Sequence, residues 1–170
     1  MTDELKKGLE GVLAAESALS AIDGDVGELI YRGYAIEDLA AGASYEEVLY
    51  LLWNGDLPTQ AELEAFEEPM VEARSVEPRV YSQLEPLAEA DERPMAALRT
   101  AASMLSAEEP EEDADPADLD AARRKGRRIT AKIPTVLAAF DRLRQGKEPV
   151  EPREDLSLAA NFLYMLNGEE

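Results

Sequence analysis

The sequence contains no cysteine and no histidine. Without cysteine it cannot form a disulfide framework, a zinc finger, an iron–sulfur site or a thiol nucleophile. Without histidine it lacks an imidazole base for a serine nucleophile, an imidazole metal ligand and an imidazole proton shuttle. The 170 residues are enough to bury a hydrophobic core. The chain therefore has a fold-sized length but a restricted set of catalytic groups.

Basic side chains are also scarce, since 17 Lys and Arg stand against 37 Asp and Glu and give a net charge of −20. Lysine is the rarer of the two and occurs at Lys6, Lys7, Lys125, Lys132 and Lys147. Such a surface repels phosphate, which argues against nucleic acid or an anionic membrane as partner. It is typical of adaptation to high salt, where counter-ions screen the repulsion. An acidic protein from a low-salt organism is the alternative.

No hydrophobic run is long enough to cross a membrane. The longest apolar stretch, residues 156–166, includes Ser157 and Asn161 and is about half as long as a span of roughly 20 residues. The first ten residues are charged and do not resemble a signal peptide. Since 45% of the residues are hydrophobic, as in ordinary folded proteins, the sequence predicts a folded cytoplasmic protein.

A short β-hairpin is predicted near the start of the chain. The segments 20–22 and 29–31 flank Asp23-Gly24-Asp25-Val26-Gly27. The Asp-Gly pair offers the positive φ that a hairpin turn favours. Beyond residue 34 the pattern is helical.

Two capping boxes mark the starts of the first longer helices. Ser44 with Glu47, and Thr59 with Glu62, have the spacing at which a hydroxyl and a carboxylate satisfy each other's backbone amides. Gly55 is placed to close the first of these helices in a left-handed cap.

Prolines give the remaining boundaries. Pro69 should end or kink the second helix. Pro78 and Pro94 suit the first turns of two further helices. We also expect a helix over residues 119–145 with a break at Pro134, stopped by the glycine at position 146.

The last two helices with clear apolar patterns differ in character. The helix from Pro94 shows a stripe of Met95, Leu98, Ala102 and Leu105 at spacings of three and four. The helix over residues 157–167 carries large apolar side chains on several faces, which predicts burial in a larger structure. The fold class is therefore all-α with one small hairpin.

The carboxylates do not form a recognisable site. Glu108, Glu109, Glu111, Glu112, Asp113 and Asp115 lie in a proline-interrupted acidic run over residues 108–118, which predicts a hydrated loop. The segment 23–28 only weakly resembles a calcium loop, and the hairpin explains it better. The glycines at 8–11 and 24–27 lack the strand–loop–helix context of a phosphate-binding loop. No serine lies in a nucleophile elbow.

One cluster reverses the sign of the charge: Arg123, Arg124, Lys125, Arg127, Arg128 and Lys132. Guanidinium groups so close together can bind phosphate or carboxylate. Pairing with the preceding acidic loop is the alternative, and local charge balance favours it. From residue chemistry alone, no residue is assigned as catalytic, cofactor-binding or metal-binding.

Nine segments in a fixed order resemble the amino-terminal signature of citrate synthases, and they extend over nearly the whole chain. They are GLEGV at 8–12, IDG at 22–24, LIYRGYAIEDLA at 29–40, SYEEV at 44–48, LLWNG at 51–55, LPT at 57–59, PMAALRT at 94–100, AKIPTV at 131–136 and ANFLYMLNG at 160–168. Each is weak alone, and the ordered set carries the resemblance.

The resemblance implies a cytoplasmic, homodimeric, almost entirely helical acyltransferase of the citrate cycle. Such an enzyme condenses acetyl-CoA with oxaloacetate and hydrolyses the citryl-CoA formed, without a permanently bound cofactor. An aspartate and two histidines handle the protons, and arginines hold the oxaloacetate carboxylates. The family's first catalytic histidine follows shortly after the segment at 160–168.

No family active-site residue has a counterpart in this sequence, so residues 1–170 are expected to be the amino-terminal portion of the large domain, without the small domain and inactive alone. Two alternatives remain open. One is a 2-methylcitrate synthase, which uses propionyl-CoA. The other is a non-catalytic helical module that docks on a partner.

Overall fold

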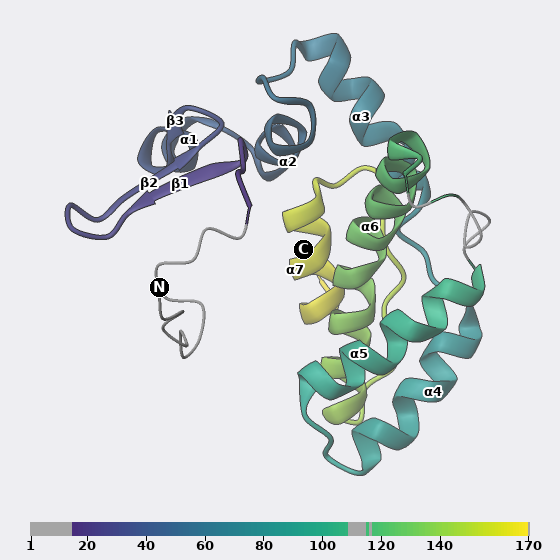
Figure 1. Ribbon diagram of the computed structural model, residues 1–170. Coiled ribbons are helices and arrows are strands. Elements are labelled where there is room, and N and C mark those ends of the chain that lie inside the picture. The colour runs from purple at the N-terminus through teal and green to yellow at the C-terminus, as the bar shows by residue number, and fades with distance from the viewer. Residues whose placement is uncertain (1–14, 109–114, 116, 170) are drawn as a thin grey trace, which may run out of the picture.

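The computed structural model describes residues 15–108, 115 and 117–169, and Figure 1 shows a small β-unit beside a larger helical body. The β-unit contains β1 (Ser20–Asp23), β2 (Glu28–Tyr31), β3 (Tyr34–Ala35) and α1 (Ile36–Gly42). The remaining helices are α2 (Tyr45–Asn54), α3 (Gln60–Glu72), α4 (Pro78–Glu89), α5 (Pro94–Leu105), α6 (Leu119–Arg144) and α7 (Leu158–Asn167), with a 3₁₀ turn at Ser106–Glu108. The predicted all-α class with a small sheet is confirmed.

The β-unit is an antiparallel sheet with strand order β1-β2-β3. The predicted hairpin is present, with Ile22 opposite Leu29. The positive φ of its loop lies at Gly27, not at the Asp-Gly pair, because the Asp23 carboxylate accepts the amides of the next residues and shapes the turn itself. The two-residue strand β3, joined to β2 through Arg32 and its neighbouring glycine with φ of 50° and 93°, was not predicted.

The helix starts follow the local signals. Ser44 and Glu47 form the predicted capping box of α2, and Thr59 and Glu62 form that of α3. Gly55 closes α2 in the left-handed conformation, with φ of 106°. Both capping boxes and the glycine cap of α2 form as expected. Each joins residues within about one helical turn, so the local sequence is enough to specify it.

Helix α6 is the centre of the helical body. It packs against α3, α4, α5 and α7, and Figure 1 shows it running between them. The main core brings together side chains from α4, α5, α6 and the loop before α4: Val76, Val80, Leu84, Ala97, Ala101, Leu105, Val136, Ala139 and Phe140. A second cluster joins α3, α6 and α7 through Phe66, Met70, Ala131 and Leu158.

Neither Pro69 nor Pro134 ends its helix. Helix α3 continues past Pro69 to Glu72, and α6 is continuous through Pro134 for 26 residues. An internal proline costs a helix about 3 kcal/mol. Around Pro134 the helix buries side chains against several neighbours, and burying one large apolar side chain contributes ~2 kcal/mol. Packing therefore outweighs the cost of the proline.

The predicted stripe of α5 is displaced. The buried residues are Ala97, Ala101 and Leu105, whereas Met95 is 72% exposed. Small side chains allow helix axes to approach closely, so the alanines face α4 and α6 and the larger Leu98 lies at the margin of the core. The sequence pattern favoured the larger side chains, whereas the small alanines are the ones that fit between the helices.

Helix α7 lies where the sequence predicts it. Ser157 caps α7, and its hydroxyl accepts the amide of Ala160. Leu163 remains 55% exposed. The segment 8–12 and most of the expected acidic loop 108–118 lie outside the described residues, so their predictions stay untested.

Gly126 offers a stability test, because it lies inside α6 and the indole ring of Trp53 lies across from it. A Cβ added there would meet the nearest Trp53 atom at 3.6 Å, an ordinary contact. We expect Gly126→Ala to raise the free energy of unfolding by roughly 0.5–1 kcal/mol, because alanine loses less backbone entropy in a helix. Urea unfolding monitored by circular dichroism measures this. A destabilised Gly126→Ala protein would contradict the packing described here.

Candidate functional site

A buried arginine joins α3 to the segment between α6 and α7, residues 145–157, which we call the connector. Arg74 follows α3 directly and is 4% exposed. Its Nη1 donates to the carbonyl oxygens of Arg153, at 2.7 Å, and Leu156, at 2.8 Å. The Thr135 hydroxyl on α6 donates to the carbonyl of Arg74 at 2.8 Å. This one residue therefore ties α3 to α6 and to the connector.

A buried glutamate fixes the start of α7. Glu46, in the first turn of α2, is 5% exposed, and its Oε1 accepts the backbone amide of Leu158 at 2.7 Å. A carboxylate at a helix amino terminus also interacts favourably with the helix dipole. Glu46 therefore caps a helix far away in the sequence, in addition to the cap that Ser157 provides.

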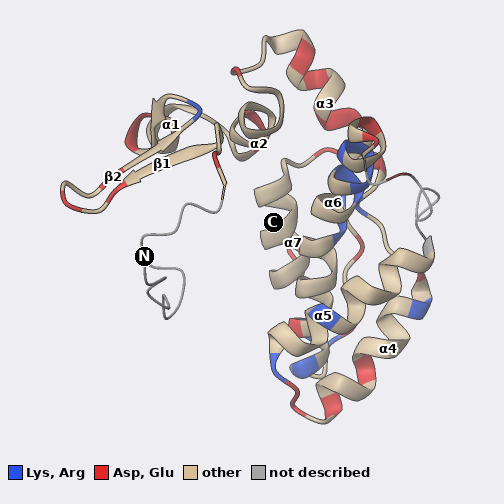
Figure 2. Cartoon of the chain, in the orientation of Figure 1, with Lys and Arg blue, Asp and Glu red and all other residues tan. Residues whose placement is uncertain are grey.

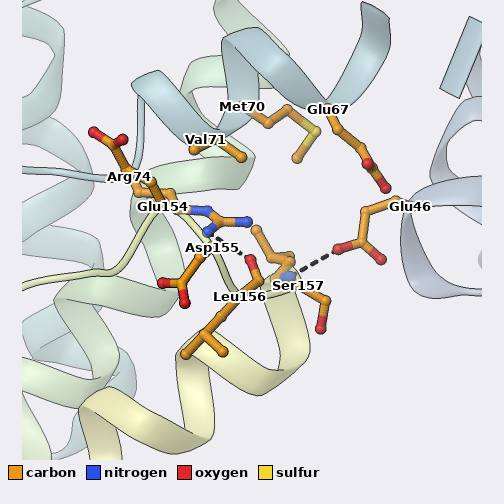
Figure 3. A pocket seen from close by; sticks show the side chains of 10 residues that line it. Glu46, Glu67, Met70, Val71, Arg74, Glu154, Asp155, Leu156 and Ser157 are labelled. Carbon is orange, nitrogen blue, oxygen red and sulfur yellow. Dashed lines mark hydrogen bonds between the residues drawn. The ribbon is translucent and has the colours of Figure 1, made fainter. Parts of the chain in front are cut away.

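Arg74 and Glu46 line a cavity of about 270 Å³ between α2, α3 and the connector. Figure 3 shows the carboxylates of Glu46 and Glu67 facing each other across it. Glu154 and Asp155 also line it, but the carboxylates that act on the Arg74 guanidinium are those of Glu46 and Glu67.

Burial determines the protonation behaviour of this cavity. Lost hydration raises the pKa of Glu67, and the negative charge of Glu46 raises it further, while Arg74 acts in the opposite direction. Lost hydration also lowers the pKa of Arg74, and the carboxylates of Glu46 and Glu67 partly offset that effect. The positive charge is therefore retained by its acidic neighbours.

The connector is braced from its other side. The backbone amide of Arg153 donates to Oδ1 of the buried Asn161 at 2.8 Å. The Arg153 guanidinium lies over the Tyr164 ring, with 5.5 Å from Cζ to the ring centroid, and donates twice to Asp155, which lowers the pKa of that carboxyl. The end of the connector next to α7 is thus held by polar contacts to α7 and within the connector.

These groups hold segments of the chain in position. Within the described ranges, no group of three or more acidic side chains is arranged to hold a metal ion. The cavity has carboxylates and a guanidinium, but its hydroxyl, that of Ser157, is engaged as a helix cap. The arrangement holds the connector and α7 in one orientation relative to α2 and α3.

Sequence reasoning did not find this site. The sequence analysis singled out neither Glu46 nor Arg74. Their partners lie 112 and 82 positions away. The only sequence signal was indirect, because Glu46 and Asn161 fall within two of the family segments, at 44–48 and 160–168.

The basic cluster found in the sequence lies elsewhere, on the first half of α6 facing the end of α3. Figure 2 shows these blue residues gathered there. Arg123 is 3.5 Å from Asp120 on the same helix, and Arg127 lies over the Phe66 ring at 5.2 Å. Pairing with the acidic loop involves residues mostly outside the described ones and stays a prediction.

Comparison with known proteins decides the family. The family model described as citrate synthase, C-terminal domain, matches residues 8–170. The chain belongs to the citrate synthase family. It is 58% identical to the citrate synthase of Haloferax volcanii over the whole of this chain and 45% of that protein. It is 46% identical to citrate synthase 2 of Bacillus subtilis over 96% of this chain and 43% of that protein.

Solved citrate synthase structures share the fold. The enzyme of Pyrobaculum aerophilum has a TM-score of 0.88 at 40% identity, over 95% of this chain and 42% of its own. The Thermoplasma acidophilum enzyme, solved as a ternary complex with carboxymethyl coenzyme A and oxaloacetate, also has a TM-score of 0.88, at 28% identity, over 99% of this chain and 44% of its own. The chain spans less than half the length of these relatives. No helix in its described part combines the length and apolar character that a membrane crossing requires.

Removal of the Arg74 side chain should loosen the connector. We expect Arg74→Met to lower the free energy of unfolding by roughly 3 kcal/mol or more, because two carbonyls lose a charged donor. Arg79→Met is the matched control, since Arg79 is exposed and its ion pair with Glu77 lies at the surface, where such a pair contributes under about 1 kcal/mol. Urea unfolding measures both. Equal effects of the two substitutions would contradict the role of Arg74.

The raised pKa of Glu67 predicts a pH-dependent stability difference. A raised folded-state pKa stabilises the fold at low pH, and this contribution is lost as pH rises through that pKa. Glu67→Gln should therefore be more stable than the parent protein at neutral pH, by roughly 0.5 kcal/mol after solvent screening, and the gap should shrink in acid. Urea unfolding across pH measures it, and added KCl should reduce it. A gap that grows in acid would contradict this sign.

Proposed function

We propose that this chain is part of a citrate synthase that condenses acetyl-CoA with oxaloacetate to give citrate and CoA. The observation that carries the proposal is 58% identity, along the whole chain, to the Haloferax volcanii citrate synthase. The ternary complex of the Thermoplasma acidophilum relative with carboxymethyl coenzyme A and oxaloacetate supports the same substrates. The chain contributes the amino-terminal helices of the large domain.

The role of this part is structural in the proposal. The chain has no histidine, and its buried polar site positions α7 instead of reacting. We assign no catalytic, cofactor-binding or metal-binding residue within residues 1–170, and we propose that these residues do not turn over substrate alone. A homodimer and a cytoplasmic location remain predictions from the resemblance and the sequence.

Adaptation to high salt is a further element of the proposal. The net charge of −20 and the rarity of lysine suit a surface whose repulsion is screened by concentrated ions. The similarity to a Haloferax protein is consistent with this.

A 2-methylcitrate synthase is the second candidate. It is favoured by 42% identity to the 2-methylcitrate synthase of Mycobacterium tuberculosis over 98% of this chain and 41% of that protein. The two activities differ in the acyl group, acetyl or propionyl. The higher identity to a citrate synthase favours acetyl-CoA.

Release of free CoA thiol with oxaloacetate present tests the proposal. We expect the intact polypeptide that carries this chain to have a higher kcat/KM with acetyl-CoA than with propionyl-CoA. The isolated residues 1–170, folded by circular dichroism in the same KCl, should release no thiol above the no-protein rate. Preference for propionyl-CoA would establish the second candidate, and turnover by residues 1–170 alone would overturn the assigned role.

A further inference from the structure

We propose that Asn167, at the end of α7, is a site of spontaneous deamidation, and that the fold protects the same dipeptide at the end of α2. The chain has three asparagines, and two of them, Asn54 and Asn167, are followed by glycine. Each Asn-Gly pair ends a helix, with the glycine in the left-handed conformation. The proposal concerns the chemistry of this chain alone and does not depend on the condensation reaction.

The reaction needs only water as co-reactant. The backbone nitrogen of Gly168 loses its proton and attacks Cγ of Asn167, so that a C–N bond forms and the bond from Cγ to Nδ2 breaks. The side-chain nitrogen leaves as ammonia with the proton, and a cyclic imide remains, with no atom oxidised or reduced. Water then opens the imide at either carbonyl, which gives aspartate or isoaspartate. Glycine favours ring closure because it has no Cβ to obstruct the approach.

Helical structure opposes this attack at both sites. The Gly168 amide donates to the carbonyl of Tyr164 at 2.8 Å. The Gly55 amide donates to the carbonyl of Leu51, also at 2.8 Å. An amide held in this way cannot lose its proton and turn toward the preceding side chain until the last helical turn opens. Helix ends open at a lower free energy than helix centres, so the two rates depend on how firmly each end is held.

Side chains hold the end of α2 in place. Nδ2 of Asn54, the atom that would leave, donates to the carbonyl of Tyr50 at 3.0 Å. The Arg32 guanidinium donates twice to the carbonyl of Leu52, at 2.9 and 3.3 Å. Hydrogen bonds from a charged donor are stronger than neutral ones, and opening of this turn has to displace Leu52 from Arg32. Asn54 should therefore be protected.

The end of α7 has weaker support. Asn167 and Gly168 are both exposed, and the Asn167 side chain has no hydrogen-bond partner among the described residues. Nη1 of Arg142 reaches the carbonyl of Leu166 only at 3.5 Å, while Nε of the same guanidinium donates to the carbonyl of Glu148 at 2.7 Å. A hydrogen bond as long as 3.5 Å is weak. The last turn of α7 should thus open more often than that of α2.

Deamidation at this position changes the contact of α7 with α6. The new carboxylate adds a negative charge at the carboxyl end of a helix, where the helix dipole disfavours it. In the isoaspartate product an extra methylene enters the backbone between positions 167 and 168. Gly168 lies so close to Arg142 that a Cβ on it would come within 2.7 Å of Nη1, so the longer backbone has to displace the guanidinium. The modification therefore loosens the hold of Arg142 on α7.

Peptide mapping by mass spectrometry tests the proposal on residues 1–170. The chain is incubated at mildly alkaline pH, which promotes loss of the amide proton, and the deamidated fraction at each asparagine is followed with time. In urea, where no structure protects either site, Asn54 and Asn167 should react at similar rates. In the folded chain we expect Asn167 to react roughly tenfold faster than Asn54, because opening at Asn54 has to break the stronger, charged hydrogen bonds. Asn161, which is 2% exposed and precedes a bulky phenylalanine, is the internal control and should stay unmodified.

Two substitutions test the two helix ends separately, and each is the matched control of the other. Arg142→Gln should raise the rate at Asn167 about threefold, as expected for loss of a weak hydrogen bond, and leave Asn54 unchanged. Arg32→Gln should raise the rate at Asn54 about tenfold, as expected for loss of a charged donor, and leave Asn167 unchanged. Circular dichroism establishes that each variant is folded.

The comparison of the two sites in the parent chain decides the proposal even if a variant fails to fold. No reaction at Asn167 in the folded chain, or a rate at Asn54 that equals or exceeds it, overturns the proposal. A rate at Asn167 that a folded Arg142→Gln variant leaves unchanged does so as well. Because no turnover is measured, the outcome is separate from that of the acyl-CoA condensation assay.

Discussion

The buried guanidinium of Arg74 holds together parts of the chain that no local interaction could join. Its two hydrogen bonds to connector carbonyls, at 2.7 and 2.8 Å, fix a segment that has no regular structure. Glu46 then positions the first turn of α7 from the other side of the cavity. A buried charge is tolerated here because opposite charges and carbonyl dipoles surround it. Without these contacts the start of α7 would lose its hydrogen bond to α2 and the connector would lose its hydrogen bonds to Arg74.

Apolar packing around α6 and polar contacts around Arg74 stabilise the fold in different ways. The core of α4, α5 and α6 is the larger of the two hydrophobic clusters, and non-directional packing of this kind tolerates a proline at position 134 in the central helix. The polar site contributes direction, since hydrogen bonds specify which carbonyl and which amide must meet. Thr135 connects the two systems, because it lies beside Pro134 on α6 and donates to the Arg74 carbonyl.

Local features were predictable from the sequence, and long-range ones were not. The starts of α2 and α3 were predictable from two capping boxes, Ser44 with Glu47 and Thr59 with Glu62, because a capping box is complete within four residues. Pro78 and Pro94 begin their helices as predicted, but the break predicted at Pro134 is absent, because helix propensity is a local quantity whereas α6 is stabilised by its neighbours. Glu46 and Arg74 gave no signal, since their partners are 112 and 82 positions away. The basic cluster was visible, but its aromatic support at Phe66 required the fold.

The small sheet is less firmly anchored to the helical body than the helices around α6 are. All four residues of β1 are exposed, and a strong anchor of the unit is Arg32, whose side chain donates twice to the carbonyl of Leu52 at the end of α2. Little buried apolar surface means a small free energy of local opening. Backbone amides of β1 should therefore exchange with deuterium through local opening, while those of α6 wait for global unfolding. Local opening of β1 should therefore leave the helical core folded.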